Sequence, residues 1–323
     1  MYRFLKIVTV AIAIQFGCFF SASAETMRAI SFLPKNHPLM SQVNVWVSSI
    51  NSQLKGKIQI NYVGGAEVIP RYQQPEAVRN GDIDIIFNVA ASYQAVIPEA
   101  SAFTLSKLSP SQERSSGFYA FMQKKHAEKL NSRYIGRWLA GNFYFWTKKN
   151  VETISSLKGL KLRTGSLFNR TMKKLGVVPV KISSSETYTA LERGVVDGFA
   201  YPAIGPRKKG WLKKVKFMIE APLFGASNAT ILMNLDKWNK LSSTTRKTID
   251  SITVAFEPKM VSHFIDGENK ELGKVLSESG VKKASFSASE KAKFIKLAYD
   301  VEWNHLATKI PGAIPELKRM TGN

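Results

Sequence analysis

Residues 157–198 contain the two segments that decide the fold, Leu157-Lys-Gly-Leu-Lys-Leu-Arg-Thr164 and Tyr188-Thr-Ala-Leu-Glu-Arg-Gly-Val-Val-Asp-Gly198. The first reads as a short apolar strand that ends next to a cation, Arg163, and a helical segment follows it. A second strand around Val177–Ile182, a second helix and a Gly-Val-Val-Asp-Gly turn come next. This alternation of strands and helices predicts an α/β fold with a largely parallel sheet.

Arg163 stands at the carboxyl end of its predicted strand, which is where open α/β sheets bind their ligands. A guanidinium group suits a carboxylate because its planar fork donates two parallel hydrogen bonds. The alternative is an ordinary arginine at a strand end, paired with a surface carboxylate. Its place at the carboxyl end of a strand makes Arg163 the first candidate for a binding residue.

Strands and helices also alternate in the rest of the chain. In the N-terminal part the predicted strands are residues 27–32, 57–63 and 83–88, and the predicted helices between them are residues 39–54 and 72–80. A second unit of this kind runs from about residue 141 to residue 227, and the chain is strongly helical from Lys237 onward. The length of 323 residues suggests about two domains.

The two opening segments resemble the solute receptors of TRAP transporters, the tripartite ATP-independent periplasmic family. That family carries a Lys-Gly-Leu-Lys-hydrophobic-Arg strand and a Tyr-x-Ala-Leu-x-x-Gly-x-Val-Asp-Gly segment. Weaker similarity covers Gly64–Pro70, Pro75–Asp84 and Asn234–Leu241. The resemblance implies a periplasmic binding protein with two α/β lobes around a central cleft, in which Arg163 contacts a ligand carboxylate.

The resemblance also sets the expected limits of the lobes. It implies a chain that crosses between the lobes more than once and a long helix near residues 243–274 that touches both. We therefore expect lobe I to comprise residues 25–140 plus about 229–268. Lobe II is expected to comprise residues 141–228 plus about 269–323.

The first residues have the features of a secretory signal peptide. Arg3 and Lys6 form a basic start, Ile7 to Phe20 is apolar, and Ala22-Ser-Ala24 is a small-residue cleavage signal. We expect cleavage after Ala24 and export to the periplasm. A membrane anchor is the alternative, but the apolar run is shorter than the roughly 20 residues needed to span a bilayer. A lipid anchor on Cys18 is a further alternative, and its flanking residues fit a lipidation signal poorly.

The composition restricts the chemistry that the chain supports. Cys18 is the only cysteine, so the chain after the signal peptide has no disulfide and no reactive thiol.

The chain has 46 lysines and arginines against 24 aspartates and glutamates, a net charge of +22. Such a charge occurs in proteins that bind nucleic acids, anionic surfaces or anionic ligands. The basic cluster Arg207–Lys216 is either a docking patch or a solvated surface. No nucleic-acid-binding motif accompanies it, and we expect no such partner.

Two aromatic residues take positions that are polar in many relatives of the resembled family. Relatives often carry an arginine in a Gly-x-Arg sequence and an asparagine in an Asp-Gly-x-x-Asn-Pro sequence, where this chain has Phe143 and Tyr201. The resemblance therefore implies a pocket with aromatic walls. Such a pocket favours a ligand with one carboxylate and an apolar or aromatic body. The alternative is that the aromatic residues of this region belong to the core of the second lobe. For the neighbouring Phe145 and Trp146, the pocket and the core are equally well supported.

Further candidates follow the predicted strands of the first lobe. Asn36 and Glu67 stand after the first and second strands, Asn88 stands at the end of the third, and Arg71 follows Pro70. The carboxyl ends of these strands should face the cleft. Turn and capping chemistry explains the first three equally well.

The sequence offers little for catalysis. The four histidines form no His-x-x-x-His pair, and no Gly-x-Ser-x-Gly motif occurs. We expect no enzyme activity, no metal and no cofactor.

The best-supported function is a monomeric receptor that binds a small organic acid, a monocarboxylate with an apolar or aromatic body. It would deliver this acid to a TRAP permease for ion-coupled uptake. The alternatives are a receptor for an ABC importer or sensor kinase, a periplasmic hydrolase or isomerase, and a polyanion binder.

Overall fold

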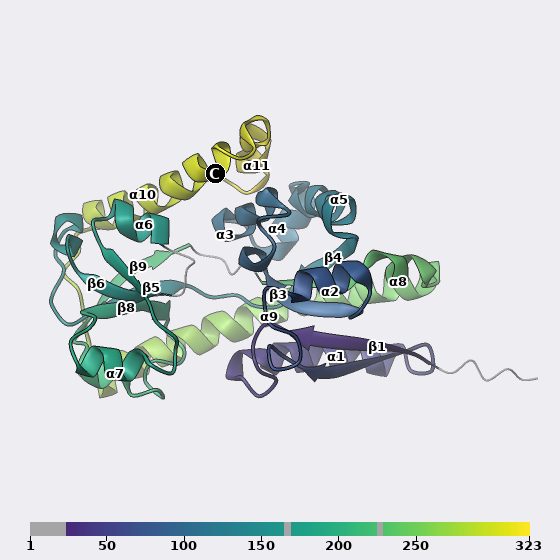
Figure 1. Cartoon of the computed structure of the whole chain (residues 1–323), viewed down its shortest axis with the longest axis horizontal. Coiled ribbons are helices and arrows are strands. Elements are labelled where there is room, and N and C mark those ends of the chain that lie inside the picture. The colour runs from purple at the N-terminus through teal and green to yellow at the C-terminus, as the bar shows by residue number, and fades with distance from the viewer. Residues whose placement is uncertain (1–23, 165–168, 225–228) are drawn as a thin grey trace, which may run out of the picture.

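Two separate β-sheets divide the molecule into two lobes (Figure 1). The computed structural model describes residues 24–164, 169–224 and 229–323. The signal peptide predicted for residues 1–24 thus lies almost entirely outside the described residues. Helices pack on both sheets, which confirms the predicted two-lobe α/β class.

The first sheet has five strands in the order β2-β1-β3-β10-β4. Their bounds are β1 (Glu25–Ser31), β2 (Ile58–Gly64), β3 (Ile85–Val89), β4 (Ser132–Arg137) and β10 (Ala229–Asn234). Strand β1 runs parallel to β2 and β3, whereas β10 lies antiparallel between β3 and β4. Every residue of β3 and β10 is buried, which explains why both read as continuous apolar runs rather than as alternating patterns.

Among the described residues, six helices belong to this first lobe. Their bounds are α1 (Ser41–Gln53), α2 (Gln74–Asn80), α3 (Ala102–Leu105), α4 (Pro110–Ser115), α5 (Phe118–Leu130) and α8 (Leu235–Lys240). Helix α1 presents its apolar stripe to β2, and Trp46 on that stripe donates a hydrogen bond to Thr253 Oγ1 at 3.0 Å. The contact fixes the first lobe to the long helix that contains Thr253.

The second sheet has six strands in the order β11-β9-β5-β8-β6-β7. Their bounds are β5 (Phe143–Thr147), β6 (Lys161–Thr164), β7 (Val178–Lys181), β8 (Gly198–Pro202), β9 (Phe217–Leu223) and β11 (Lys282–Lys283). The first of the two segments that decide the fold ends in β6, and the second forms most of helix α7 (Thr187–Glu192) and the turn into β8. Strand β6 is parallel to β7 and β8, as predicted. Gly198 is required at the start of β8 because a Cβ would lie 2.0 Å from the Trp146 carbonyl oxygen. Helices α6 (Asn169–Lys174) and α7 complete the βα units.

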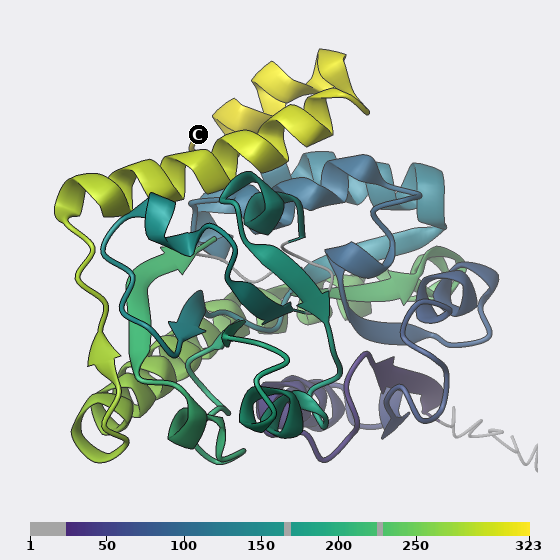
Figure 2. The same cartoon turned by 60° about the vertical axis from the view of Figure 1, so that its left-hand side comes forward.

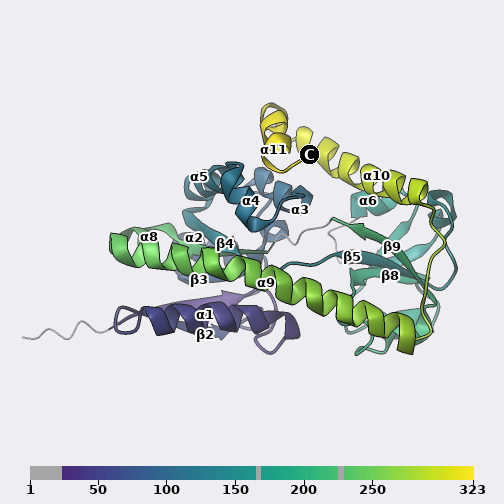
Figure 3. The same ribbon diagram turned by 180° about the vertical axis from the view of Figure 1, so that it is seen from behind.

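Within the described residues, the chain passes from one sheet to the other at three places. Residues 138–142 join β4 to β5, a second segment joins β9 to β10, and helix α9 (Ser243–Glu278) is the third. Helix α9 lies behind both lobes (Figure 3) and is the long helix that the sequence led us to expect. Ser242 begins it by accepting a hydrogen bond from the Thr245 amide at 3.1 Å.

The C-terminal helices also connect the lobes. Helix α10 (Ala288–Ala307) packs on β9 and α6 in the second lobe and on α3 in the first, along the upper side of the molecule in Figure 2. After α11 (Ile314–Met320), the Asn323 amide group donates to the Leu105 carbonyl oxygen at 2.7 Å. The lobe limits remain a prediction, and these contacts argue for counting the last residues with lobe I.

Candidate functional site

A cavity of about 610 Å³ lies between the two lobes. Its walls come from the loops after β1 and β2, the crossing segment 138–142, the strand ends of β6, β7 and β8, and one face of α9. Most of the lining is apolar, with a few polar side chains among it. This size and this mixture are typical of a small-molecule site.

Arg163 lies in the wall that the second lobe contributes. It is only 7% exposed, and its Nε donates a hydrogen bond to the Ile182 carbonyl oxygen at 2.9 Å. Its guanidinium carbon lies 5.6 Å from the Tyr201 ring centroid and 5.8 Å from that of Trp211. Burial lowers the pKa of the Arg163 guanidinium, with Tyr201 acting in the opposite direction.

Arg71 lies in the wall that the first lobe contributes. Its Nε donates to Ser92 Oγ at 2.9 Å, and Ser92 Oγ in turn donates to Asn88 Oδ1 at 2.7 Å. Its guanidinium carbon lies 5.2 Å from the Phe32 ring centroid and 5.0 Å from that of Tyr72. Burial lowers the pKa of the Arg71 guanidinium as well. The two lobes therefore each bring one arginine to the cavity.

Phe143 and Tyr201 line the same cavity from neighbouring strands of the second sheet. The ring of Tyr201 packs edge-on against Trp211, with centroids 5.0 Å apart. Phe145 and Trp146, by contrast, are 1% and 0% exposed and belong to the core. The alternation of side chains between the two faces of a strand does not by itself separate Phe143 from Phe145, because both point to the same face. The cavity reaches only the beginning of β5, so Phe143 lines it and Phe145 does not.

Three candidates from the first lobe do not lie at the wall of the cavity. Asn36 is exposed on the loop after β1. Glu67 is exposed, and its carboxylate accepts a hydrogen bond from the Gly65 amide at 2.8 Å, which holds the turn. Asn88 is fully buried, and its amide group donates to the Arg71 carbonyl oxygen at 3.3 Å and to Gln74 Oε1 at 2.8 Å. Turn chemistry and support of Arg71 therefore account for these residues.

Glu268 on α9 is a cavity residue that the sequence does not reveal. Its Oε2 accepts a hydrogen bond from the Asn142 amide at 2.8 Å, and its Oε1 accepts from Asn142 Nδ2 and from the Tyr144 hydroxyl, both at 2.7 Å. These contacts fasten the long helix to the crossing segment at the floor of the cleft. The partners lie 126 and 124 residues apart along the chain, so no local pattern announces them.

His37 also lines the cavity without a signal in the sequence. Its Nδ1 accepts a hydrogen bond from the Leu39 amide at 3.3 Å, which leaves the proton of the neutral ring on Nε2. Burial lowers the pKa of His37, and the nearby Lys209 of the second lobe lowers it further. The ring therefore stays neutral at neutral pH.

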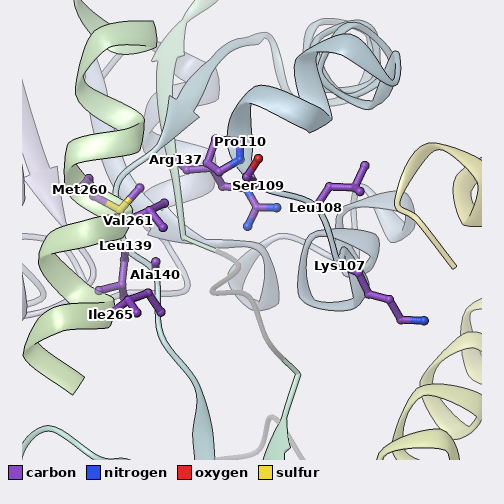
Figure 4. A pocket seen from close by; sticks show the side chains of 10 residues that line it. All are labelled: Lys107, Leu108, Ser109, Pro110, Arg137, Leu139, Ala140, Met260, Val261 and Ile265. Carbon is purple, nitrogen blue, oxygen red and sulfur yellow. The ribbon is translucent and has the colours of Figure 1, made fainter. Parts of the chain in front are cut away.

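A smaller cavity of about 170 Å³ is lined in part by the crossing segment (Figure 4). Leu139 and Ala140 line both cavities, so the two are neighbours at the crossing segment. Arg137 lies in its wall, with its guanidinium ion-paired to the buried Glu113. The remaining wall is largely apolar and comes from α9 and the start of α4.

Two negative findings concern the part of the chain that the structure describes. No group of three or more histidine, cysteine, aspartate or glutamate side chains there is arranged to hold a metal ion. No helix within the same ranges combines the length and the apolar character needed to cross a membrane.

Comparison with known proteins places these features in context. The sequence model of the bacterial extracellular solute-binding proteins, family 7, matches residues 30–307. A monocarboxylate 2-oxoacid-binding periplasmic protein of Nostoc sp. is 26% identical over 255 residues, which cover 76% of this chain and 70% of that protein. The sialic acid-binding periplasmic protein SiaP of Vibrio cholerae is 24% identical over 62% of this chain and 64% of its own length.

Solved structures show the same fold. A TRAP periplasmic solute-binding protein of Desulfovibrio salexigens with bound orotic acid superposes with a TM-score of 0.76 at 19% identity, covering 92% of this chain and 97% of that one. An extracytoplasmic solute receptor of Bordetella pertussis that binds pyroglutamic acid gives a TM-score of 0.76 at 14% identity, covering 93% and 100%.

Proposed function

Because the chain belongs to the bacterial extracellular solute-binding proteins of family 7, which are binding proteins and not enzymes, we propose that it is the solute receptor of a TRAP transporter. Its cleft binds a small organic acid. The observation that carries the proposal is the buried guanidinium of Arg163, which lines the cavity and has no carboxylate within ion-pair distance among the described residues. A ligand carboxylate supplies that missing charge.

Arg163 and the aromatic rings together define the end of the ligand that lies in the second lobe. The guanidinium fork receives one carboxylate, and the faces of Phe143 and Tyr201 receive an apolar or aromatic body. The simplest ligand of this type is a monocarboxylate. Orotic acid and pyroglutamic acid, which are bound by structural neighbours, are small carboxylic acids of this general size.

The three crossings between the two sheets support a hinge mechanism for uptake. The lobes close on the acid, and the closed form docks on the membrane subunits of a TRAP permease, which takes up the acid with an ion. A receptor that serves an ABC importer or a sensor kinase is the alternative. The family match and the TRAP neighbours favour the permease. We propose that the receptor acts as a monomer in the periplasm after cleavage of residues 1–24.

The basic cluster Arg207–Lys216 adds little to this choice. Arg207 pairs with Glu271 at 2.9 Å and Lys214 pairs with Glu192 at 3.1 Å, so part of its charge is compensated within the lobe. We read the cluster as a solvated surface next to the cleft rather than as a nucleic-acid site.

A thermal-shift screen tests the proposed function. Protein comprising residues 25–323 is heated with single organic acids, and a bound acid raises the melting temperature by mass action. The Arg163→Ala variant should lose the response. Arg193→Ala, which removes an exposed arginine from the same lobe, should keep it. If no organic acid stabilises the wild-type protein, or if Arg163→Ala responds as the wild type does, the proposal fails.

A further inference from the structure

Arg71 and Arg163 differ from Arg114 and Arg137, two further arginines of the described residues that are partly or fully buried. Arg114 donates to the Glu257 carboxylate at 2.9 Å, and Arg137 forms an ion pair with Glu113. Burial acts to lower the pKa of Arg114 and Arg137, but these carboxylates outweigh it and raise both. For Arg71 and Arg163 burial prevails, and no carboxylate of the described residues forms an ion pair with either. Carboxylates therefore compensate Arg114 and Arg137, but no described carboxylate compensates the two cleft arginines.

The two cleft arginines are held in the same way. Each donates one hydrogen bond from Nε, Arg71 to Ser92 Oγ and Arg163 to the Ile182 carbonyl oxygen. No hydrogen bond joins their terminal nitrogens to a described residue, and both side chains line the cavity. A guanidinium that is fixed at Nε and open at its terminal nitrogens is prepared to receive a carboxylate.

The other charged or aromatic groups of the cleft do not substitute for a counter-ion. Glu268 lines the cavity, but its carboxylate accepts hydrogen bonds from Asn142 and Tyr144 and pairs with neither arginine. The rings of Phe32 and Tyr72 lie beside Arg71 and attract its charge. A ring face attracts a cation less strongly than a carboxylate does, and it accepts no pair of hydrogen bonds from the fork.

A ligand with a single carboxylate at Arg163 would therefore leave the Arg71 guanidinium buried on closure without a counter-ion. We infer that the ligand carries two anionic groups, one carboxylate for Arg163 in the second lobe and a second carboxylate for Arg71 in the first. An apolar or aromatic middle lies between them against Phe143 and Tyr201. This inference rests on the proposed function, keeps its ligand class of small organic acids, and replaces the monocarboxylate with a diacid that bridges the lobes.

Matched acids test the inference by titration calorimetry. The probes are benzoate with isophthalate and terephthalate, and hexanoate with succinate, adipate and suberate. We expect at least one diacid to bind at least tenfold more tightly than its matched monoacid. Arg71→Ala should weaken diacid binding about tenfold or more and so abolish that preference, because it removes a charge-assisted contact that only the second carboxylate makes. Arg79→Ala, which removes an exposed arginine of the same lobe, is the control.

The outcomes separate the inference from the proposed function. If monoacids bind as tightly as every diacid, or if Arg71→Ala weakens both classes equally, the second carboxylate is refuted and Arg71 acts on the same group as Arg163. If Arg163→Ala leaves acid binding unchanged, the proposed function itself fails, whatever Arg71 does. Arg71→Lys keeps the charge without the fork, and should retain only part of the preference for diacids. Its result decides the matter if Arg71→Ala does not fold.

Discussion

Arg163 already uses one edge of its guanidinium group to hold its own position. Its Nε is bound to the Ile182 carbonyl oxygen, and the terminal nitrogens remain for a ligand. We predict that Arg163→Ala lowers the affinity for the cognate acid roughly ten- to a hundredfold, the equivalent of about 1.5–3 kcal/mol. Arg163→Lys should recover little because lysine lacks the fork. Calorimetry with Arg193→Ala as control measures this, and equal affinities in all three variants would contradict it.

His126 should make the folded state sensitive to acid. It is fully buried, its Nδ1 donates to the Met122 carbonyl oxygen at 2.7 Å, and its Nε2 has no partner among the described residues. Burial lowers the pKa of His126 from 6.5 to about 4, against the opposing effects of Met122 and Glu99. Below about pH 6.5 the unfolded chain therefore binds a proton that the folded chain does not.

The free energy of unfolding should consequently fall as the pH drops from about 6.5 toward 4, by about 3 kcal/mol from this residue. The His126→Phe variant keeps a ring among Tyr93, Phe103 and Tyr134 and removes the titrating group. Urea unfolding of both proteins at several pH values in this window measures the difference. The same loss of stability in the variant would show that other groups cause it.

At the scale of elements, Glu268 is the point where α9 is attached to the crossing segment. We predict that Glu268→Ala lowers the free energy of unfolding by about 2–5 kcal/mol, because it leaves the Asn142 amide and the Tyr144 hydroxyl without an acceptor. Asp266→Ala, an exposed carboxylate on the same helix, should change it by less than about 0.5 kcal/mol. Urea unfolding of the three proteins is the measurement. Similar values for both variants would mean that the attachment contributes no stability.

Strands and helices that are marked by a local sequence pattern could be predicted. The position of a strand in its sheet, which depends on partners far away in the chain, could not. The strands around Arg163 and the helix after Ser242 follow from apolar spacing and a capping residue. The insertion of β10 between β3 and β4 does not, because a buried apolar run fits any interior position of a sheet. Arg163, Arg71, Phe143 and Tyr201 were expected at the cleft and line it, whereas Asn36, Glu67 and Asn88 do not. A polar residue after a strand serves a turn as readily as a ligand.

At the scale of the whole molecule, the positions of Arg71 and Arg163 couple binding to closure. A ligand can shift the equilibrium between open and closed forms only through contacts that differ between them. A diacid that reaches both lobes has such contacts, whereas a monoacid held by Arg163 alone has fewer. We predict that the tightest diacid reduces the radius of gyration measured by small-angle X-ray scattering, and that its matched monoacid at saturation does so less. Equal reductions by both acids would contradict the coupling.

The interleaved order of the strands also has a consequence for the time course of folding. The first sheet needs β10 to join β3 to β4, and β10 is made only after five strands of the second sheet. During synthesis from the N-terminus, the edges of β3 and β4 that pair with β10 therefore stay unpaired until residue 234 has been added to the chain. Pairing over such a distance along the chain is slow. The second lobe in turn waits for β11, so neither lobe is finished before the other has begun.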